Sequence, residues 1–207
     1  MKKLEAYGWQ STKPAQSVAY IVPEIKRILA PLGVHRLADL GCGNGGVTGE
    51  LAACGFDVVG IEQDGEGVDL ARRAHPEAKF YRYGVQDDPQ DLLQYEKPFD
   101  VVVSTEVIEH LYAPHLLLEF AQRILKDDGF LLVSTPYHGY LKNVALSALN
   151  KWDAHHTALW HGGHIKFWSR KTLGKLFEQN RFHVEGFRGV GRAPYLWKSM
   201  IMLGRKV

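Results

Sequence analysis

The sequence predicts an α/β domain built on a mostly parallel β-sheet. Short runs of β-branched and other apolar residues alternate along the chain with amphipathic stretches at helical spacing. The chain has 207 residues, of which 45% are hydrophobic and 23% charged, as in ordinary soluble globular proteins. We expect one domain over residues 1–207, with a helical N-terminal segment over residues 1–33 and an insert over residues 137–163.

The first half of the chain begins with a helix and continues as strand–helix pairs. Apolar residues from Val18 to Leu29 recur every three or four positions, which predicts a helix over residues 15–30 with a kink at Pro23. Uninterrupted apolar runs predict the strands, and Gly55 stands where a helix is expected to end. The expected elements are a strand over 36–40, a helix over 47–54, a strand over 57–62, a helix over 67–74 and a strand over 79–83.

The second half repeats the alternation and adds two late strands. The turn residues Asp127, Asp128 and Gly129 precede one strand, and Ser169 is a candidate N-cap for the last helix. The expected elements are a strand over 99–104, helices over 105–112 and 114–126, a strand over 129–134, a helix over 169–180 and strands over 182–190 and 199–207.

The insert over residues 137–163 is far longer than the usual connection of about 2–6 residues between a strand and a helix. Apolar residues from Leu141 to Trp152 predict an amphipathic helix within it. We assign three of its histidines to the loop surface: His155, His156 and His161. Two interpretations stay open for four aromatic residues, which either line a ligand pocket or pack the insert: Tyr137, Tyr140, Trp152 and Trp160.

Composition excludes several classes of protein. No apolar run approaches the ~18–20 residues that cross a bilayer, and no apolar stretch follows the first two lysines, so we expect neither a membrane-spanning nor a secreted protein. Lysine and arginine number 25 against 23 acids, which argues against a nucleic-acid partner. Cys42 and Cys54 are the chain's two cysteines, which fits a reduced, cytoplasmic protein without a disulfide framework.

A glycine-rich turn marks a candidate binding site. Asp39 lies near the end of a predicted strand, and Gly41, Gly43 and Gly45 follow in a turn that opens a helix. Such a turn lets a ligand approach the backbone, and its amides suit a negatively charged group. Glu62 ends the next strand, where a carboxylate can accept both hydroxyls of a ribose. The pattern alone is compatible with a tight structural turn, a nicotinamide dinucleotide site or another adenosine site.

The run Asp39-Leu40-Gly41-Cys42-Gly43-Asn44-Gly45 resembles the nucleotide motif of the class I S-adenosylmethionine-dependent methyltransferases. The similarity extends over nearly the whole chain and implies a Rossmann-like sheet of order 3-2-1-4-5-7-6 with its last strand antiparallel and helices on both faces. It further implies S-adenosylmethionine as cofactor and S-adenosylhomocysteine as product, with the glycine loop against the methionine portion. The implied cofactor contacts are Asp39, Gly41, Cys42, Gly43, Gly45, Glu62, Gln63, Gln86, Asp87 and Thr105.

The segment Thr105-Glu106-Val107-Ile108-Glu109-His110 follows the predicted fourth strand. On a helix, Glu106, Glu109 and His110 would share one face, which suits either a divalent cation or simple exposure to solvent. The segment resembles the E-x-x-E-H motif of a methyltransferase subset, which includes ubiquinone-biosynthesis O-methyltransferases and small-RNA 3′-terminal 2′-O-methyltransferases. That subset also carries a distal histidine, which corresponds here to His164. The resemblance implies a metal shell of Glu106, Glu109, His110 and His164 around Mg²⁺ or another divalent cation.

The same residues can activate a hydroxyl group without a metal. A neutral histidine accepts a proton near neutral pH, so His110 and His164 are the candidate bases, with Glu109 orienting them. We therefore predict that the catalytic residues are His110, Glu109 and His164.

The resemblance to the ubiquinone enzymes implies O-methylation of a small phenolic or quinol-like acceptor. The stretch over residues 141–152 would then allow peripheral contact with a membrane. Alternatives are an RNA 3′-terminal 2′-O-methyltransferase, a non-catalytic S-adenosylmethionine-binding protein and a nicotinamide oxidoreductase. The balanced charge argues against RNA, and four convergent acid and histidine residues argue against a non-catalytic protein.

Overall fold

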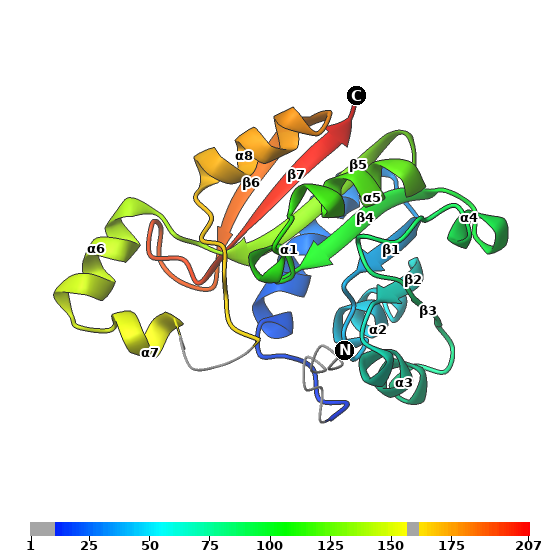
Figure 1. The fold of residues 1–207 in the computed structure, drawn as a ribbon, viewed down its shortest axis with the longest axis horizontal. Helices are drawn as coiled ribbons and strands as arrows, with labels where there is room; N and C mark the ends of the chain where they lie inside the picture. The colour runs from blue at the N-terminus through cyan, green and yellow to red at the C-terminus, as the bar shows by residue number, and fades with distance from the viewer. Residues whose placement is uncertain (1–10, 157–161) are drawn as a thin grey trace.

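The computed structural model describes residues 11–156 and 162–207, and it contains one seven-stranded sheet of order β3-β2-β1-β4-β5-β7-β6 (Figure 1). The strands are β1 (Arg36–Leu40), β2 (Asp57–Glu62), β3 (Lys79–Arg82), β4 (Phe99–Thr105), β5 (Leu125–Pro136), β6 (Phe182–Val190) and β7 (Ser199–Lys206). The first five strands pair in parallel, and β7 runs antiparallel to both β5 and β6. The predicted fold class and strand order are confirmed.

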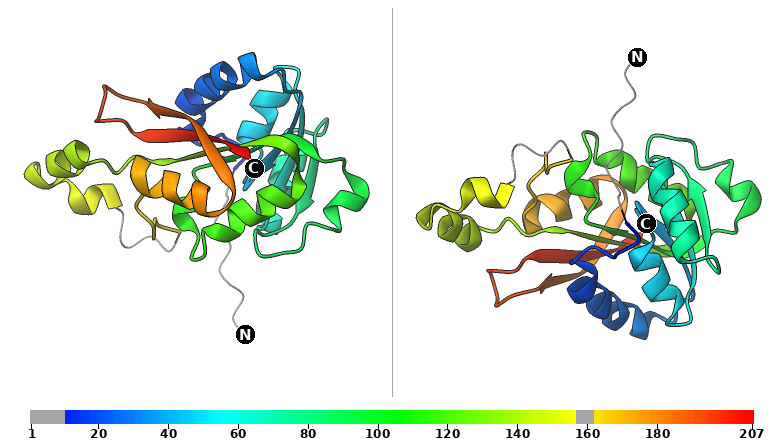
Figure 2. Two further views of the ribbon diagram at one scale, coloured as in Figure 1. Left: turned by 90° about the horizontal axis from the view of Figure 1, so that it is seen from above. Right: turned by 90° about the horizontal axis from the view of Figure 1, so that it is seen from below.

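Helices cover both faces of this sheet (Figure 2). The helices α1 (Val18–Leu29) and α2 (Gly46–Ala52) pack on one face, and α4 (Leu92–Tyr95), α5 (His115–Ile124) and α8 (Arg170–Gln179) pack on the other. The helix α3 (Gly65–Ala74) packs against β2 and β3.

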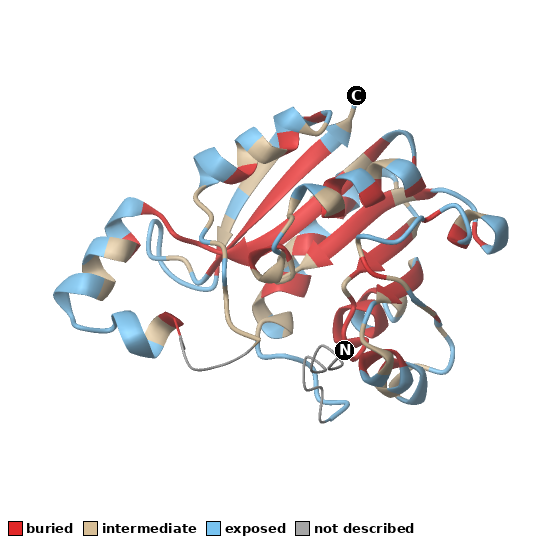
Figure 3. Ribbon diagram, in the orientation of Figure 1, coloured by how far each residue is buried: buried red, intermediate tan, exposed pale blue. Residues whose placement is uncertain are grey.

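Side chains of the central strands alternate between the two faces. In β4, Val101 and Val103 point to the core beneath α1 and α2, whereas Val102 points to the core beneath α5 and α8. Both faces are apolar because both are covered by helices, so these strands are continuous hydrophobic runs in the sequence and are buried along most of their length (Figure 3).

The prediction of a helix over residues 105–112 is wrong. Thr105 still pairs with Ser134 as part of β4, and only Ile108–His110 forms a short 3₁₀ turn. The Glu106 backbone N–H donates to the Ser134 carbonyl at 3.1 Å, and Glu106 has a φ of 53°. The sheet therefore extends to the point where an α-helix was expected to begin, and the left-handed residue then turns the chain out of the strand.

Two other boundaries also differ from expectation. The strand β5 begins at Leu125, which pairs with Phe99, and an irregularity in the ladder separates this pair from the next. The predicted insert helix is instead two helices, α6 (Tyr140–Ala148) and α7 (Trp152–His156), with Asn150 between them at a φ of 51°. Both extend beyond the sheet from the end of β5 (Figure 1).

Asp100 joins the beginnings of three neighbouring strands. Its carboxylate accepts hydrogen bonds from the backbone N–H groups of His35 and Arg36 at 3.0 and 2.8 Å, just before and within β1. The Lys126 ammonium donates to the same carboxylate at 2.6 Å. Burial opposes ionisation of Asp100, but these donors outweigh it and lower the pKa of Asp100 to about 2.

We predict that Asp100→Asn lowers the free energy of unfolding by about 2 kcal/mol at pH 7. Because the pKa is lower in the folded chain, the carboxylate stabilises the fold above about pH 4 and loses this effect as the pH falls toward 2. Denaturant titrations at several pH values would measure a difference between wild type and variant that shrinks over this interval.

The matched control is Asp127→Asn, because Asp127 is fully exposed and lies 3.8 Å from Lys206. An Asp100→Asn penalty no larger than that of the control would contradict this interpretation.

Candidate functional site

The glycine loop between β1 and α2 is held by backbone hydrogen bonds to β2. The N–H groups of Gly41 and Cys42 both donate to the Ile61 carbonyl, at 2.8 and 3.1 Å. Gly41, Gly43 and Gly45 all have positive φ, at 82°, 55° and 83°, which side chains with a Cβ adopt only with strain. The backbone of this turn therefore favours glycine at all three positions, and binding of a ligand by the turn stays a prediction.

Two carboxyl groups lie beside this loop, the buried Asp39 and the half-buried Glu62. Thr48 Oγ1 donates to Asp39 Oδ2 at 2.7 Å, and the buried Asp39 Oδ1 has no hydrogen-bond partner among the described residues. Burial raises the pKa of Asp39 to about 7. Glu62 accepts from the Gly43 and Asp64 backbone N–H groups at 2.9 and 2.8 Å, and burial raises its pKa above the ordinary value.

The other predicted cofactor contacts occupy the same edge of the sheet. Gln63 follows β2, Gln86 and Asp87 follow β3, and Thr105 ends β4. Asp87 closes its own turn, because its carboxylate accepts from the Gly84 N–H at 2.7 Å. Cys42 is buried, and burial raises the pKa of its thiol well above the ordinary range. Carboxyl ends of parallel strands form the ligand edge of open α/β sheets.

Glu109, His110 and His164 form a second group at this edge. The buried Glu109 Oε1 lies 3.9 Å from His110 Nε2 and 4.0 Å from His164 Nε2. The two imidazole rings meet edge to face with centroids 4.9 Å apart. Among the described residues, these three form the group of acids and histidines whose ligand atoms all lie within 4.8 Å of one another.

Backbone contacts hold the distal histidine near the turn after β4. The Glu109 carbonyl accepts from the Ile165 and Lys166 N–H groups at 2.9 and 3.0 Å. His110 Nδ1 lies 3.2 Å from the Gly163 carbonyl. Because a carbonyl only accepts, Nδ1 carries the proton, and the lone pair of His110 Nε2 is on the side of Glu109.

The electrostatics of this group favour a bound cation or a shared proton. Burial lowers the pKa of His110, and burial together with the neighbouring His110 lowers the pKa of His164 to about 4, so both rings are neutral at pH 7. Burial and then the charge of Glu106 raise the pKa of Glu109 well above its ordinary value. Glu109 Oε1 has no hydrogen-bond partner among the described groups, although Thr135 Oγ1 donates to Oε2 at 3.0 Å.

Glu106, predicted as a fourth metal ligand, lies outside the group. Ser134 Oγ donates to Glu106 Oε1 at 2.8 Å, and Ser199 Oγ donates to Oε2 at 3.1 Å. Burial raises the pKa of Glu106 to about 7. The predicted shared helical face required a helix that does not form, so the spacing does not bring Glu106 beside His110.

Several polar groups of the site escaped the sequence analysis. Thr135 lies near the carboxyl end of β5, and the tendency of ligand sites to lie at the carboxyl ends of parallel strands could have marked it as a site residue. Ser199 begins β7, and its Oγ lies 3.2 Å from Tyr20 Oη, a long-range contact that no sequence pattern signals. Tyr137 is buried with its ring 5.0 Å from that of Trp197, whereas Tyr140 is 80% exposed, so these two aromatics do not face one pocket. Trp160 and His161 lie outside the described residues.

No helix among the described residues is long and apolar enough to cross a bilayer.

Comparison with known proteins identifies the family. A sequence profile described as a methyltransferase domain matches residues 12–185. The chain is 28% identical over 175 residues to the mitochondrial ubiquinone biosynthesis O-methyltransferase of Rattus norvegicus, covering 80% of this chain and 49% of that protein. It is 35% identical over 103 residues to the corresponding enzyme of Maricaulis maris, covering 48% of this chain and 40% of that protein. The chain thus spans about half the length of these relatives.

Solved structures share the fold at lower identity. A methyltransferase structure from Bacillus halodurans superposes with a TM-score of 0.69 at 16% identity, covering 90% of this chain and 98% of that one. The magnesium protoporphyrin IX methyltransferase of Synechocystis PCC 6803 with bound S-adenosylhomocysteine gives 0.65 at 17% identity, covering 90% and 82%.

The profile match covers most of the chain, and the strand order agrees with the order that the sequence motif implied. The chain belongs to the class I S-adenosylmethionine-dependent methyltransferases.

Proposed function

We propose that this methyltransferase transfers a methyl group to a hydroxyl oxygen of a small phenolic or quinol-like acceptor. The observation that carries the proposal is the convergence of a buried carboxylate oxygen and two neutral imidazoles after the central strand β4. The similarity to proteins named ubiquinone biosynthesis O-methyltransferases supports oxygen as the methylated atom and a phenolic acceptor.

The cofactor is proposed to lie across the carboxyl ends of β1 and β2. The glycine loop then contacts the methionine portion, and the Glu62 carboxylate accepts the ribose hydroxyls. Glu62 is positioned for this because backbone N–H groups from Gly43 and Asp64 fix both of its oxygens. Asp39 Oδ1, which is buried and has no hydrogen-bond partner among the described residues, offers a further acceptor beside the same loop.

The chemistry requires a nucleophilic oxygen in line with the methyl–sulfur bond. As the oxygen–carbon bond forms, the carbon–sulfur bond breaks and its electron pair stays on sulfur, which yields S-adenosylhomocysteine. The hydroxyl proton passes to Nε2 of His110 or His164, and the nearby carboxylate of Glu109 stabilises the positive charge of the ring. The Gly163 carbonyl holds the His110 ring through Nδ1. Neutral imidazoles are the form that this step needs.

The same three residues fit a divalent cation. Glu109 Oε1 is buried without a hydrogen-bond partner among the described groups, and His110 Nε2 and His164 Nε2 lie 3.9 and 4.0 Å from it, so ligand atoms of the kinds that divalent cations bind stand close together. Mg²⁺ or a similar ion held by Glu109, His110 and His164 would lower the pKa of the acceptor hydroxyl.

Peripheral membrane contact through residues 141–152 is part of the proposal. Leu141, Val144, Leu149 and Trp152 are 53%, 47%, 68% and 47% exposed. An exposed apolar surface on the protruding helices α6 and α7 and the link between them suits an acceptor delivered from a lipid phase.

The test of the function begins with cofactor choice and then varies the acceptor. S-adenosylhomocysteine should raise the melting temperature and NAD should not. Methyl transfer should then be detected with catechols or quinol precursors and not with short RNAs. Methylation of the RNAs alone would reject the phenolic acceptor, and stabilisation by NAD alone would reject the cofactor.

The packing of Gly41 against Val107 generates a prediction for cofactor binding. A Cβ at Gly41 would lie 2.5 Å from the Val107 side chain, and the φ of 82° adds strain. We expect Gly41→Ala to weaken S-adenosylhomocysteine binding by about tenfold or more, about 1.4 kcal/mol, in calorimetric titration. Gly33→Ala is the control, because Gly33 also has positive φ but no atom of the described residues lies within 4 Å of its added Cβ. Equal binding by the two variants would contradict the proposed loop function.

We predict that His164→Ala lowers kcat by about 100-fold or more, because removing a base typically costs two to four orders of magnitude. Affinity for S-adenosylhomocysteine should stay unchanged, since the imidazole contacts Glu109 and His110 rather than the glycine loop. His183→Ala is the matched control, since His183 is exposed on β6.

Chelation separates the two modes of activation. If a divalent cation participates, excess chelator should abolish turnover and Mg²⁺ should restore it, whereas full activity in chelator leaves the histidine base. Unchanged kcat in His164→Ala would reject His164 both as base and as metal ligand. Unchanged kcat in His110→Ala as well would reject both modes of activation.

A further inference from the structure

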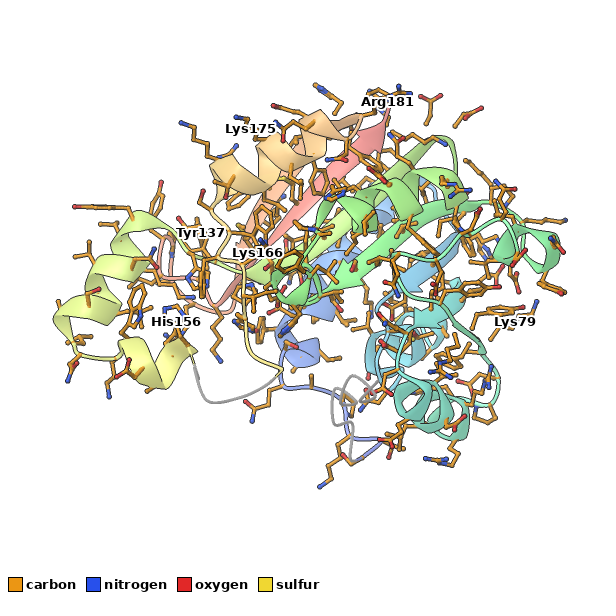
Figure 4. The ribbon with its side chains drawn as sticks, viewed as in Figure 1. Lys79, Tyr137, His156, Lys166, Lys175 and Arg181 are labelled. Atoms are coloured by element: carbon orange, nitrogen blue, oxygen red, sulfur yellow. The ribbon has the colours of Figure 1, made fainter. Side chains whose placement is uncertain are left out.

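The histidines of the insert pack against one another and against neighbouring aromatic rings. His138, just after β5, stacks on His156 of α7 with ring centroids 5.5 Å apart, and His155 lies 5.0 Å from His156. Trp152 and Phe167 also contact these rings. His156 is 9% exposed, so the expectation that it belongs to the loop surface is wrong. Figure 4 shows His156 at the insert end of the molecule, whereas the turn after β4 is held by groups on β5, β7 and α1.

Glu106, the first residue of that turn, has an unusual backbone conformation. Its φ of 53° lies in the left-handed region, which a residue with a side chain adopts only with strain. Glu106 is not exposed, whereas the other described non-glycine residues with positive φ are all exposed: Asp128, Asn150, Arg181 and Tyr195. Strain inside a structure persists only where the surrounding contacts enforce it, and it is common at functional sites. The contacts of Glu106 therefore show what fixes the turn.

Two buried serines hold the carboxyl group of Glu106. Ser134 of β5 and Ser199 of β7 are 0% and 1% exposed. Ser134 Oγ accepts from the Glu106 backbone N–H at 3.2 Å and donates to Glu106 Oε1 at 2.8 Å. Ser199 Oγ donates to Glu106 Oε2 at 3.1 Å. Because a buried hydroxyl group without a partner costs free energy, the two serines and Glu106 hold one another in place.

Tyr20 extends this chain of hydrogen bonds to α1. Tyr20 Oη lies 3.2 Å from Ser199 Oγ. With Glu106 ionised, Ser199 donates its one hydroxyl proton to the carboxylate, so Tyr20 is the donor to Ser199. Three elements that are far apart in the sequence, α1, β5 and β7, thus meet at one side chain.

The strand β5 links Glu106 to the proposed reaction site. Thr135 follows Ser134 in the strand, and Thr135 Oγ1 donates to Glu109 Oε2 at 3.0 Å. Two consecutive residues of β5 therefore bind the two carboxyl groups of the turn. A shift of Glu106 relative to Ser134 would also move Glu109 relative to Thr135.

The rest of the turn connects Glu106 to His110. The His110 N–H donates to the Val107 carbonyl at 2.9 Å, which closes the turn. The Val107 side chain fills the space that a Cβ at Gly41 would occupy. His110 Nδ1 lies 3.2 Å from the Gly163 carbonyl, a contact that requires the ring to stay in this position.

We propose that Glu106 is a positioning residue, which fixes Glu109 and His110 at the proposed reaction site through its hydrogen bonds to β5 and β7. It takes this function in place of the metal ligation that the sequence motif implied, because both of its carboxylate oxygens accept hydrogen bonds from serine hydroxyls. The inference rests on the proposed function, since it concerns the support of the residues to which that reaction is assigned. A displacement of about 1 Å in such residues can lower a rate about 100-fold.

Two variants of Glu106 separate positioning from metal binding. In Glu106→Gln the amide oxygen can accept from Ser134, and the amide N–H can donate to Ser199, whose own proton then goes to Tyr20 Oη. The hydrogen-bond chain is thus complete without the negative charge that a metal site uses. Glu106→Ala loses both contacts to serine.

The test measures the tautomer of His110 by long-range ¹H–¹⁵N NMR of the imidazole rings, with the His110 signals assigned from the spectrum of His110→Ala. Wild type and Glu106→Gln should show one tautomer with its proton on Nδ1, because the Gly163 carbonyl accepts that proton. In Glu106→Ala the ring should average between its two tautomers, and Ser199→Ala should do so in part. Asp128→Ala is the matched control, because Asp128 also carries a carboxylate at positive φ, 59°, but is exposed near the start of β5.

Methylation of catechol gives a second measurement. Glu106→Ala should lower kcat about 10- to 100-fold at unchanged KM, whereas Glu106→Gln should lower kcat by no more than about threefold. A contribution to stability alone would leave kcat unchanged in each variant that a thermal melt shows to be folded.

Three results would overturn the inference. The first is a fixed Nδ1–H tautomer in both Glu106→Ala and Ser199→Ala, and the second is averaging in Glu106→Gln to the same extent as in Glu106→Ala. The third is calorimetry in which Glu106→Gln weakens Mn²⁺ binding as strongly as Glu109→Gln, because Glu106 would then be a ligand.

Failure of the proposed function gives a different result. Tautomer averaging in Glu106→Ala and Ser199→Ala, without methylation of any phenol by wild type, would uphold the positioning of the turn and reject the phenolic acceptor. If Glu106→Ala does not fold, Ser199→Ala decides, because it removes a single hydrogen bond to the carboxyl group.

Discussion

The buried carboxylate of Glu109 is the group around which the carboxyl end of the sheet is arranged. Its backbone carbonyl accepts two N–H groups from residues 165 and 166, and Thr135 at the end of β5 donates to one carboxylate oxygen. The other oxygen is left between two imidazoles and has no hydrogen-bond partner among the described groups. A charged carboxylate in such a place is costly unless a cation or proton joins it. The Glu109 carboxylate therefore favours the binding of a cation or a proton beside the central strands.

The glycine loop after β1 and the turn that carries Glu109 are neighbours because β1 and β4 are paired strands. Val107, one residue after the left-handed Glu106, packs where Gly41 would carry a Cβ. The absence of that atom lets the turn after β4 lie directly against the loop after β1. A methyl donor on one and a hydroxyl held by the other would then meet with little freedom of approach, which is how rigid supports accelerate a transfer between two bound groups.

The sequence predicted the strands, their order and the loop because each depends on local patterns or on a motif. The prediction of a helix after β4 is wrong for a physical reason. The spacing of Glu106, Glu109 and His110 is helical. However, the Glu106 N–H donates a hydrogen bond to the Ser134 carbonyl of β5, which keeps the chain in the sheet. The contact between Ser199 and Glu106 joins residues far apart in the chain, which no local periodicity reveals. The burial of His156 likewise depends on α7 folding back over His138.

The insert exposes apolar side chains to solvent and buries polar ones, which is the reverse of the usual distribution. Its outward side exposes Leu141, Leu149 and Trp152, whereas His138, Lys142 and His156 are buried. Burying a lysine and two imidazoles contributes little to stability, and apolar residues of similar size would pack the same space at lower cost. Stability alone therefore gives no reason for polar groups there. Lys142 does attract the buried carboxyl group of Glu106, so one charge of the insert acts on the turn after β4.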